Sequence, residues 1–314
     1  MKVAAGRAFA QLHDAAARRV LPELQWVTVD GAGTWSADAS ECELAIYADE
    51  AYNDQFIDAL AAMSGLRWGH SEDAGTDGRF VDSLRRRGVA VTHSPGSNAP
   101  EVAEMALAFV LWSAKRLGEL RDQQRAHQWE KLPLQSLSDK TALVVGLGAI
   151  GGRIARLGLA LGLTVTGIRR SSAPFAGLAA QGTLADLHSL ASDADYVILA
   201  LPISADTERL VDQATIDAMK PTATLINVGR GGLVDVAALA TALREGRLAQ
   251  ACLDVLPVEP WPSNDPLWDL PNLLITPHNA SVSPLYIHRV GEAWIENLRR
   301  FTTGLELLNH IAGT

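Results

Sequence analysis

The chain has 314 residues, enough for about two domains that each bury a hydrophobic core. Its composition, 48% hydrophobic and 20% charged, is typical of a folded globular protein. A formal net charge of -9 and a pI near 5.4 argue against nucleic acid or an anionic membrane as the main partner, because both need a basic face. Any anionic ligand therefore needs a local positive site.

No segment predicts export, a membrane span or a metal site. The N-terminal segment lacks an apolar stretch followed by small residues at a cleavage position. The most apolar run, from Met105 to Ala114, is too short to cross a bilayer. The two cysteines, Cys42 and Cys252, lie far apart and lack the spacing of a zinc site or a redox pair. We therefore expect a cytoplasmic protein without a bound metal.

Strand-like and helix-like segments alternate from Gln25 to Thr92. The runs QWVTV, ELAIYA, LRWGH and VAVTH are short and β-rich, whereas DQFIDALAAM and GRFVDSLRRRG have helical spacing. The only candidate for an earlier strand, KVAA, is short. This alternation is typical of βα units on a parallel sheet.

A long buried helix is expected to begin after Asn98, whose side chain can cap it. Beyond this helix six apolar runs, TALVVG, LTVTGI, YVILAL, TLINVG, AQACLDV and LLITPH, predict strands covered on both faces. The segment DVAALATALREGRL predicts a crossover helix capped by Asp235 and ended at Gly246. The amphipathic segment from Ile287 onward is expected to pack on the first domain. Four tryptophans are interpreted as packing residues: Trp35, Trp68, Trp112 and Trp129.

The run TALVVGLGAIGGRIARLGLALG places three glycines in G-x-G-x-x-G order between a predicted strand and a predicted helix. Gly146 allows the tight turn, Gly148 lets the backbone approach a pyrophosphate, and Gly151 lets the helix pack closely on the strand. The N–H groups of Ala149 and Ile150 then face the anion at the positive end of the helix. The alternative is an ordinary tight strand-to-helix turn, although the strand and helix context favours a dinucleotide site.

The second strand of that unit is followed by Arg169, Arg170 and Ser171, where an NAD-specific site normally has an acidic residue. Two guanidinium groups at this position can bind a 2′-phosphate. We therefore predict NADP(H) as the preferred cofactor over NAD(H). The alternative is a basic turn with one arginine that merely faces water.

Three polar residues follow predicted strands at the edge where ligands of open α/β sheets bind. They lie in LINVGRGGLVD, ACLDVLPVEP and LLITPHNA. Arg230 supplies a cation for a substrate carboxylate, and His278 supplies a proton for the oxygen of a carbonyl under reduction. Glu259 orients the imidazole and favours its protonated form. Taken singly, each residue is equally consistent with a surface ion pair, a turn acid or a structural histidine.

These motifs resemble the D-isomer-specific 2-hydroxyacid dehydrogenase family over nearly the whole chain. The resemblance depends on the motifs GLGAIG, NVGRGGLVD, LDVLPVEP, DPLWDLPNLLITPH and SPGSNAPEVAE. It also depends on spacing, since 29 positions separate Arg230 from Glu259 and 19 positions separate Glu259 from His278. It implies two doubly wound parallel-sheet α/β domains. A Rossmann dinucleotide-binding domain, residues 98–286, is inserted into a flavodoxin-like substrate domain formed by residues 1–97 and 287–314.

The resemblance also implies further site residues and an activity. In the family a loop binds the substrate carboxylate through backbone N–H groups, which points to Ala74 and Gly75 in EDAGTDG. The expected cofactor-lining positions outside the glycine loop and the basic turn are Pro202, Thr207, Val228, Asp254, His278 and Ala280. The expected reaction is reduction of a small 2-oxo acid such as glyoxylate or hydroxypyruvate to the D-2-hydroxy acid, by a homodimer. The alternatives are a dinucleotide-sensing, co-repressor-like binding protein, or a member of the family that uses another hydride donor.

Overall fold

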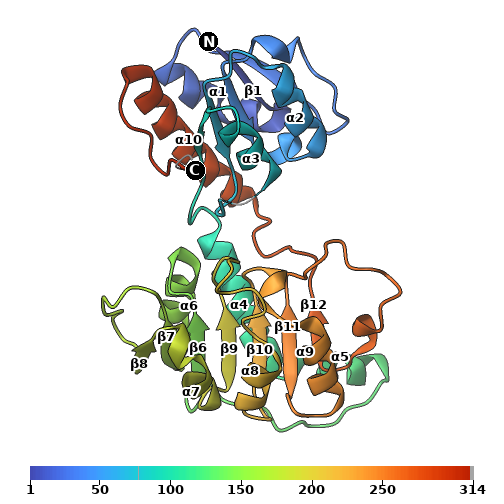
Figure 1. The fold of residues 1–314 in the computed structure, drawn as a ribbon. Helices are drawn as coiled ribbons and strands as arrows, with labels where there is room; N and C mark the ends of the chain where they lie inside the picture. The colour runs from blue at the N-terminus through green and yellow to red at the C-terminus, as the bar shows by residue number, and fades with distance from the viewer. Residues whose placement is uncertain (77, 312–314) are drawn as a thin grey trace. The chain divides into compact units, whose positions relative to one another are not determined.

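The computed structural model describes residues 1–76 and 78–311, and the chain forms two compact units. Unit 1 comprises Met1–Asn98 and Ser283–Thr314, and unit 2 comprises Ala99–Val282. Each unit is built on one parallel sheet with helices on its faces, which confirms the predicted fold class (Figure 1). No helix within the described ranges is long and apolar enough to span a bilayer.

Unit 1 contains a five-stranded parallel sheet in the order β2-β1-β3-β4-β5, the order of flavodoxin-like folds. The short N-terminal run is a true strand, which lies between β2 and β3 in the sheet. The strands are β1 (Lys2–Gly6), β2 (Gln25–Val29), β3 (Leu44–Tyr47), β4 (Trp68–Ser71) and β5 (Ala90–Thr92). The α-helices of the unit are α1 (Arg7–Val20), α2 (Asp54–Ala59), α3 (Arg79–Arg85) and α10 (Pro284–Thr303).

Alternate residues of the unit 1 strands enter two cores on opposite faces of the sheet, as the period of two dictates. One core joins Val3 of β1 and Trp68 of β4 to Trp294 of α10. The other joins Ala4 of β1 to Phe56 of α2 and Phe80 of α3. Helix α10 packs against α1, and thus the C-terminal segment belongs to the first core of this unit.

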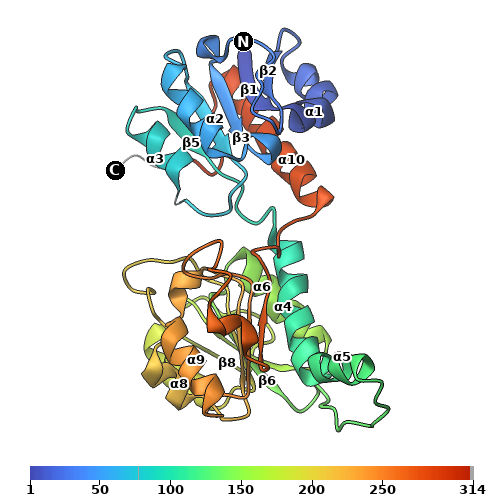
Figure 2. The ribbon, with the colours of Figure 1, turned by 90° about the vertical axis from the view of Figure 1, so that its right-hand side faces the viewer.

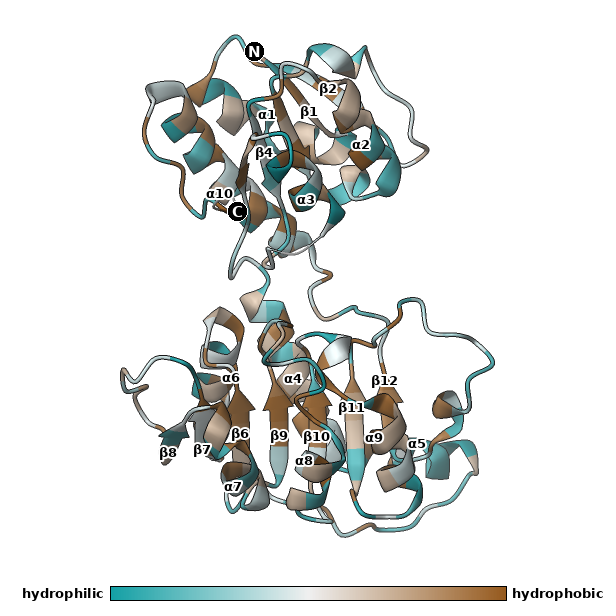
Figure 3. Cartoon of the chain, viewed as in Figure 1, coloured by the Kyte–Doolittle hydropathy of each residue, from teal (hydrophilic) through white to brown (hydrophobic). Residues whose placement is uncertain are grey.

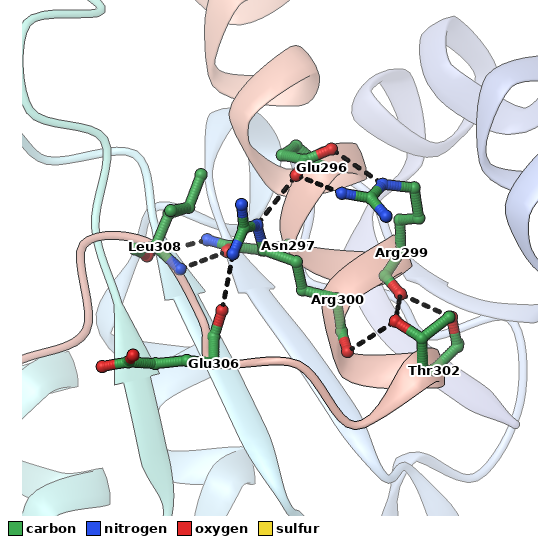
Figure 4. A network of polar contacts seen from close by, with 8 residues as sticks. Glu296, Asn297, Arg299, Arg300, Thr302, Glu306 and Leu308 are labelled. Carbon is green, nitrogen blue, oxygen red and sulfur yellow. Dashed lines mark hydrogen bonds and ion pairs between the residues drawn. The ribbon is translucent and has the colours of Figure 1, made fainter.

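The end of α10 is tied to the chain that follows it by polar contacts (Figure 4). The amide group of buried Asn297 donates to the carbonyl of Leu308 and accepts from its N–H at 3.0 and 2.8 Å. Arg300 donates to Glu296 and to the carbonyl of Glu306. A helix that ends on Gly304 in the left-handed region is thus followed by a segment fixed on the same unit.

Unit 2 contains a seven-stranded parallel sheet in the order β12-β11-β10-β9-β6-β7-β8. Counted from β6, this is the Rossmann order 3-2-1-4-5-6 with one further strand. The strands are β6 (Thr141–Val145), β7 (Thr164–Ile168), β8 (Ala180–Gly182), β9 (Tyr196–Leu199), β10 (Thr224–Asn227), β11 (Gln250–Leu253) and β12 (Leu273–Ile275). The α-helices are α4 (Ala99–Ala114), α5 (Leu117–Arg125), α6 (Ala149–Ala160), α7 (Leu187–Ser192), α8 (Gln213–Ala218) and α9 (Val236–Arg244).

Helices cover both faces of this sheet, with α4 and α6 on one side and α8 and α9 on the other (Figure 2). Neighbouring residues of one strand therefore enter different cores: Val144 packs toward α4 and α6, and Val145 packs toward α8 and α9. The strands β6, β9 and β10 are largely hydrophobic as a result (Figure 3). Asp235 caps α9 as predicted, with its carboxylate accepting from two N–H groups of the first turn.

Two local predictions are wrong. Helix α4 begins after Asn98, but the side-chain oxygen of Asn98 is buried without a hydrogen-bond partner among the described residues, so the predicted cap is not formed. Trp129 is 98% exposed and is not a packing residue. It lies in the irregular segment after α5, outside both cores of unit 2, where residue type alone does not produce burial.

Candidate active site

Three neighbouring strands deliver the three predicted reacting residues to one edge of the unit 2 sheet. The strands β10, β11 and β12 pair in parallel, so their carboxyl ends lie side by side. Arg230 follows β10, Glu259 follows β11, and His278 follows β12. Ligands of open α/β sheets bind at this edge.

His278 and Glu259 form a hydrogen-bonded pair in which Nδ1 lies 2.7 Å from Oε2. The second carboxylate oxygen accepts the N–H of Leu256 at 2.9 Å, which fixes the carboxylate. Because Nδ1 donates to the carboxylate, Nε2 is the atom left for a reacting group. Both side chains are partly exposed, at 47% and 39% for His278 and Glu259.

The loop that carries Arg230 approaches the loop before Glu259 very closely. A Cβ on Gly231 would lie only 1.9 Å from the carbonyl carbon of Leu256, so only glycine allows this approach. Asn227, at the end of β10, stabilises the turn at Gly229 and Arg230. Its side chain donates to the carbonyl of Arg230 and accepts from the N–H of Gly229. The buried asparagine therefore positions the arginine loop.

Asp254 is buried beneath the histidine loop and organises it. One carboxylate oxygen accepts from the hydroxyl of Thr276 and the N–H of Asn279, and the other accepts from the N–H of Ala280 at 3.0 Å. The carbonyl of Asp254 accepts the N–H of His278, whose φ is +51°. Val228 and Ala280 are buried in the same core. The predicted cofactor-lining residues Val228, Asp254 and Ala280 thus support the edge that carries His278.

The glycine-rich loop connects β6 to α6 with the geometry of a close backbone turn. Gly146 has a φ of +102°, and a Cβ on Gly151 would lie 1.8 Å from the carbonyl oxygen of Gly146. By contrast, a Cβ on Gly148 would meet no atom within 4 Å. The first N–H groups of α6, starting at Ala149 and Ile150, lie at the same edge and lack partners within the helix. These residues fit the pyrophosphate of a dinucleotide.

The basic turn that follows β7 is partly ordered by its own backbone. Arg169 donates to the carbonyl of Ala173 at 3.4 Å, and the hydroxyl of Ser171 accepts the N–H of Ala173. Arg170 is exposed. After β9, the hydroxyl of Thr207 donates to the carbonyl of Pro202 at 3.0 Å and accepts the N–H of Ser204. Thr207 thus shapes its own loop.

In unit 1, Ala74 and Gly75 lie in the loop that follows β4, at the carboxyl edge of that sheet. The ring nitrogen Nδ1 of His93 lies 3.1 Å from the carbonyl oxygen of Ala74. Sequence reasoning missed the buried side chains that hold this loop, because they meet only through the pairing of β4 with β5. These side chains are His70, Thr92 and Ser94.

Comparison with known proteins agrees with this architecture. A family model described as the NAD binding domain of D-isomer specific 2-hydroxyacid dehydrogenases matches residues 107–280. The chain is 34% identical over 245 residues to a glyoxylate/hydroxypyruvate reductase B of Klebsiella pneumoniae strain 342, which covers 76% of each chain.

Two solved structures are similar over nearly the whole chain. A D-isomer specific 2-hydroxyacid dehydrogenase family protein from Aeromonas salmonicida subsp. salmonicida A449 has a TM-score of 0.88 at 31% identity, covering 100% of this chain and 99% of that chain. A D-isomer specific 2-hydroxyacid dehydrogenase from Xanthobacter autotrophicus Py2, solved in complex with NADPH and MES, has a TM-score of 0.80 at 28% identity, covering 99% and 98%. The chain belongs to the D-isomer specific 2-hydroxyacid dehydrogenase family of oxidoreductases, which confirms the resemblance seen in its motifs.

Proposed function

We propose that this oxidoreductase reduces a small 2-oxo acid to the D-2-hydroxy acid, with His278 as acid and base, Glu259 as its orienting partner and Arg230 as a substrate-binding cation. The observation that carries this proposal is the 2.7 Å pair between His278 Nδ1 and Glu259 Oε2, which leaves Nε2 for the reacting oxygen. The loop that leads to Glu259 is also approached closely by the Arg230 loop, at Gly231 and Leu256.

Each of the three side chains has a separate task in this reaction. The carbonyl oxygen of the substrate gains negative charge during reduction and takes a proton from Nε2 of His278. The carboxylate of Glu259 stabilises the imidazolium before the transfer and keeps the ring oriented. Arg230 binds the anionic substrate. In the reverse direction the neutral imidazole accepts the proton of the hydroxyl group.

A nicotinamide dinucleotide, when bound, supplies the hydride in reduction and accepts it in oxidation. The chain would hold its pyrophosphate with Gly146, Gly148, Ala149, Ile150 and Gly151. Further contacts would come from Pro202, Thr207, Val228, Asp254, His278 and Ala280.

We further propose a preference for NADP(H) over NAD(H). Two arginines follow β7 where an acidic residue would repel a 2′-phosphate, and Ser171 adds a hydroxyl. The similar protein from Xanthobacter autotrophicus carries NADPH in its solved structure, which supports this proposal.

The proposed substrates are glyoxylate and hydroxypyruvate, and their carboxylate would bind the N–H groups of Ala74 and Gly75. The name of the Klebsiella pneumoniae relative supports this substrate class. A homodimer and a cytoplasmic location remain predictions.

The test is the initial rate of glyoxylate and of hydroxypyruvate reduction, followed by nicotinamide absorbance with NADPH and NADH at matched concentrations. Faster turnover at low NADPH than at low NADH supports both the activity and the arginine argument. A preference for NADH supports the proposed reductase activity and contradicts the proposed preference for NADP(H). No oxidation of either nucleotide contradicts the proposed activity.

A further inference from the structure

A chain of buried hydrogen bonds runs under the loop after β4 in unit 1. His70 and Thr92 face each other in the paired strands β4 and β5, and Nδ1 of His70 lies 2.7 Å from the Thr92 hydroxyl. That hydroxyl also accepts the indole N–H of Trp68 at 2.8 Å. On the other side of the ring, Nε2 of His70 lies 2.9 Å from the hydroxyl of Ser94. All four side chains are buried.

The direction of each hydrogen bond follows from the chemistry of the groups. The hydroxyl of Ser94 donates to the carbonyl of Ser71, which can only accept, and so the Ser94 oxygen accepts a hydrogen bond from the N–H at Nε2 of His70. Burial, with a smaller contribution from His93, lowers the pKa of His70 from 6.5 to about 3. In the neutral ring Nδ1 is then an acceptor, which accepts a hydrogen bond from the hydroxyl of Thr92. The tautomer of His70 is thus fixed with its proton on Nε2.

This chain ends on the backbone of the predicted substrate loop. Ser94 binds that backbone twice, since its hydroxyl donates to the carbonyl of Ser71 and its N–H donates to the carbonyl of Asp73 at 3.0 Å. The next carbonyl, of Ala74, lies within hydrogen-bond distance of His93 Nδ1. The carbonyl of Glu72, between those of Ser71 and Asp73, accepts a hydrogen bond from the hydroxyl of Tyr286 on α10.

The N–H groups of the same loop divide into two sets. Those of Glu72 and Asp73 are used within unit 1, by the carbonyl of Tyr47 and the hydroxyl of Ser71. Those of Ala74 and Gly75 donate to no group in residues 1–76 and 78–311. Four consecutive carbonyls are therefore engaged by the unit, whereas two consecutive donors are left for a ligand.

We propose that His70, acting through Ser94, is a positioning residue that fixes this loop with the Ala74 and Gly75 N–H groups ready for the carboxylate of a small 2-oxo acid. The inference rests on the proposed function, because it takes the ligand of these N–H groups to be the substrate. His70 itself does not touch the substrate. Its effect is on substrate binding, and proton transfer stays with His278.

The first test is Ser94→Ala, which removes the hydroxyl that links His70 to Ser71. We expect the KM for glyoxylate to rise about tenfold, because a loop that is no longer fixed loses about one N–H hydrogen bond to the carboxylate, with kcat within about threefold of wild type. Dinucleotide affinity stays unchanged, because the glycine loop lies in unit 2. The matched control is Ser83→Ala, which removes a hydroxyl that donates to the carbonyl of Phe80 in α3 of the same unit. An unchanged KM in Ser94→Ala overturns the proposal.

The second test needs no turnover. Nitrogen NMR of the wild-type protein should show His70 neutral with its proton on Nε2, and a proton on Nδ1 overturns the proposed chain. Oxalate, used as a carboxylate probe, should slow hydrogen exchange at the Ala74 and Gly75 amides, and less so in Ser94→Ala. Equal slowing in both proteins also overturns the proposal. A wild-type protein that shows these exchange effects without reducing any 2-oxo acid contradicts the proposed function and leaves the positioning role intact.

Discussion

Two histidines in this molecule have opposite surroundings. His278 in unit 2 is partly exposed and bonds a carboxylate, whereas His70 in unit 1 is fully buried between two hydroxyl groups. The carboxylate beside His278 can compensate a charge on the ring. Around His70 only neutral groups bond the ring, and a charge there would cost its full desolvation.

The comparison shows how neighbours decide the role of an imidazole. A ring that can gain and lose a proton suits general acid and base chemistry, which needs access to the reacting group. A ring that holds one tautomer is a rigid link with one donor and one acceptor, suited to fixing a backbone. The same residue type thus serves the proposed chemistry in one unit and substrate positioning in the other.

The largest effect should come from His278→Gln, which removes the proton donor and keeps a polar side chain. We expect kcat for glyoxylate reduction to fall by about 10²–10⁴-fold, the usual contribution of a general acid, with dinucleotide affinity unchanged. Steady-state kinetics and nucleotide fluorescence measure both. His188→Gln, which removes an exposed histidine of the same unit, is the control and should keep wild-type kcat. Wild-type activity in His278→Gln would exclude it as the acid.

The next change, Glu259→Gln, tests whether the charge beside the ring matters. An amide keeps a hydrogen-bonding group near Nδ1 but no longer stabilises the imidazolium, so we expect kcat to fall by about 10–100-fold. Glu259→Asp keeps the charge on a shorter arm and should lose less. If Glu259→Gln and Glu259→Asp have equal activity, the negative charge of Glu259 does not contribute to catalysis, which contradicts the prediction.

The proposed catalytic residues of unit 2 could be located from the sequence because each follows an apolar run. In a parallel sheet such runs end at a common edge, so Arg230, Glu259 and His278 were expected on one edge without any coordinates. The same apolar runs predicted the strand residues that form the two cores of unit 2. The short edge strand β8 was missed, since three residues of AQG carry no periodic signal. The exposure of Trp129 was also missed, because composition does not show where a chain leaves the core.

The His70 network could not be predicted from the sequence. His70 and Thr92 lie 22 positions apart and meet only through the register of β4 with β5. A shift of one residue would turn the two side chains to opposite faces of the sheet. Polar residues within buried strands therefore gain their meaning only when the neighbouring strand is known.

The burial of His70 predicts a smaller, pH-dependent effect on stability. Its pKa is about 3 when folded and near 6.5 when unfolded, so between these pH values the unfolded chain binds up to one more proton than the folded chain. The contribution is complete above pH 6.5 and is lost as pH falls toward 3, by at most about 1.4 kcal/mol per pH unit. Urea unfolding at about pH 5 and about pH 7 should show a flatter pH dependence in His70→Gln than in wild type. Ser83→Ala removes no titratable group and should keep the wild-type slope, and parallel slopes for wild type and His70→Gln would contradict the argument.

The smallest effect is expected on the exposed side of the same loop. The hydroxyl of Tyr52 donates to Asp73 at 2.9 Å, but the other oxygen of that carboxylate accepts from Ser71, and Tyr52 is 47% exposed. Water can replace the hydroxyl in Tyr52→Phe, so we expect the KM for glyoxylate to rise by no more than about threefold. Tyr196→Phe, which removes a hydroxyl in unit 2, is the control. A KM change as large as in Ser94→Ala would mean that the exposed Tyr52 contact fixes the loop as firmly as the buried contacts do. That result would contradict the proposal that His70 is the residue that positions the loop.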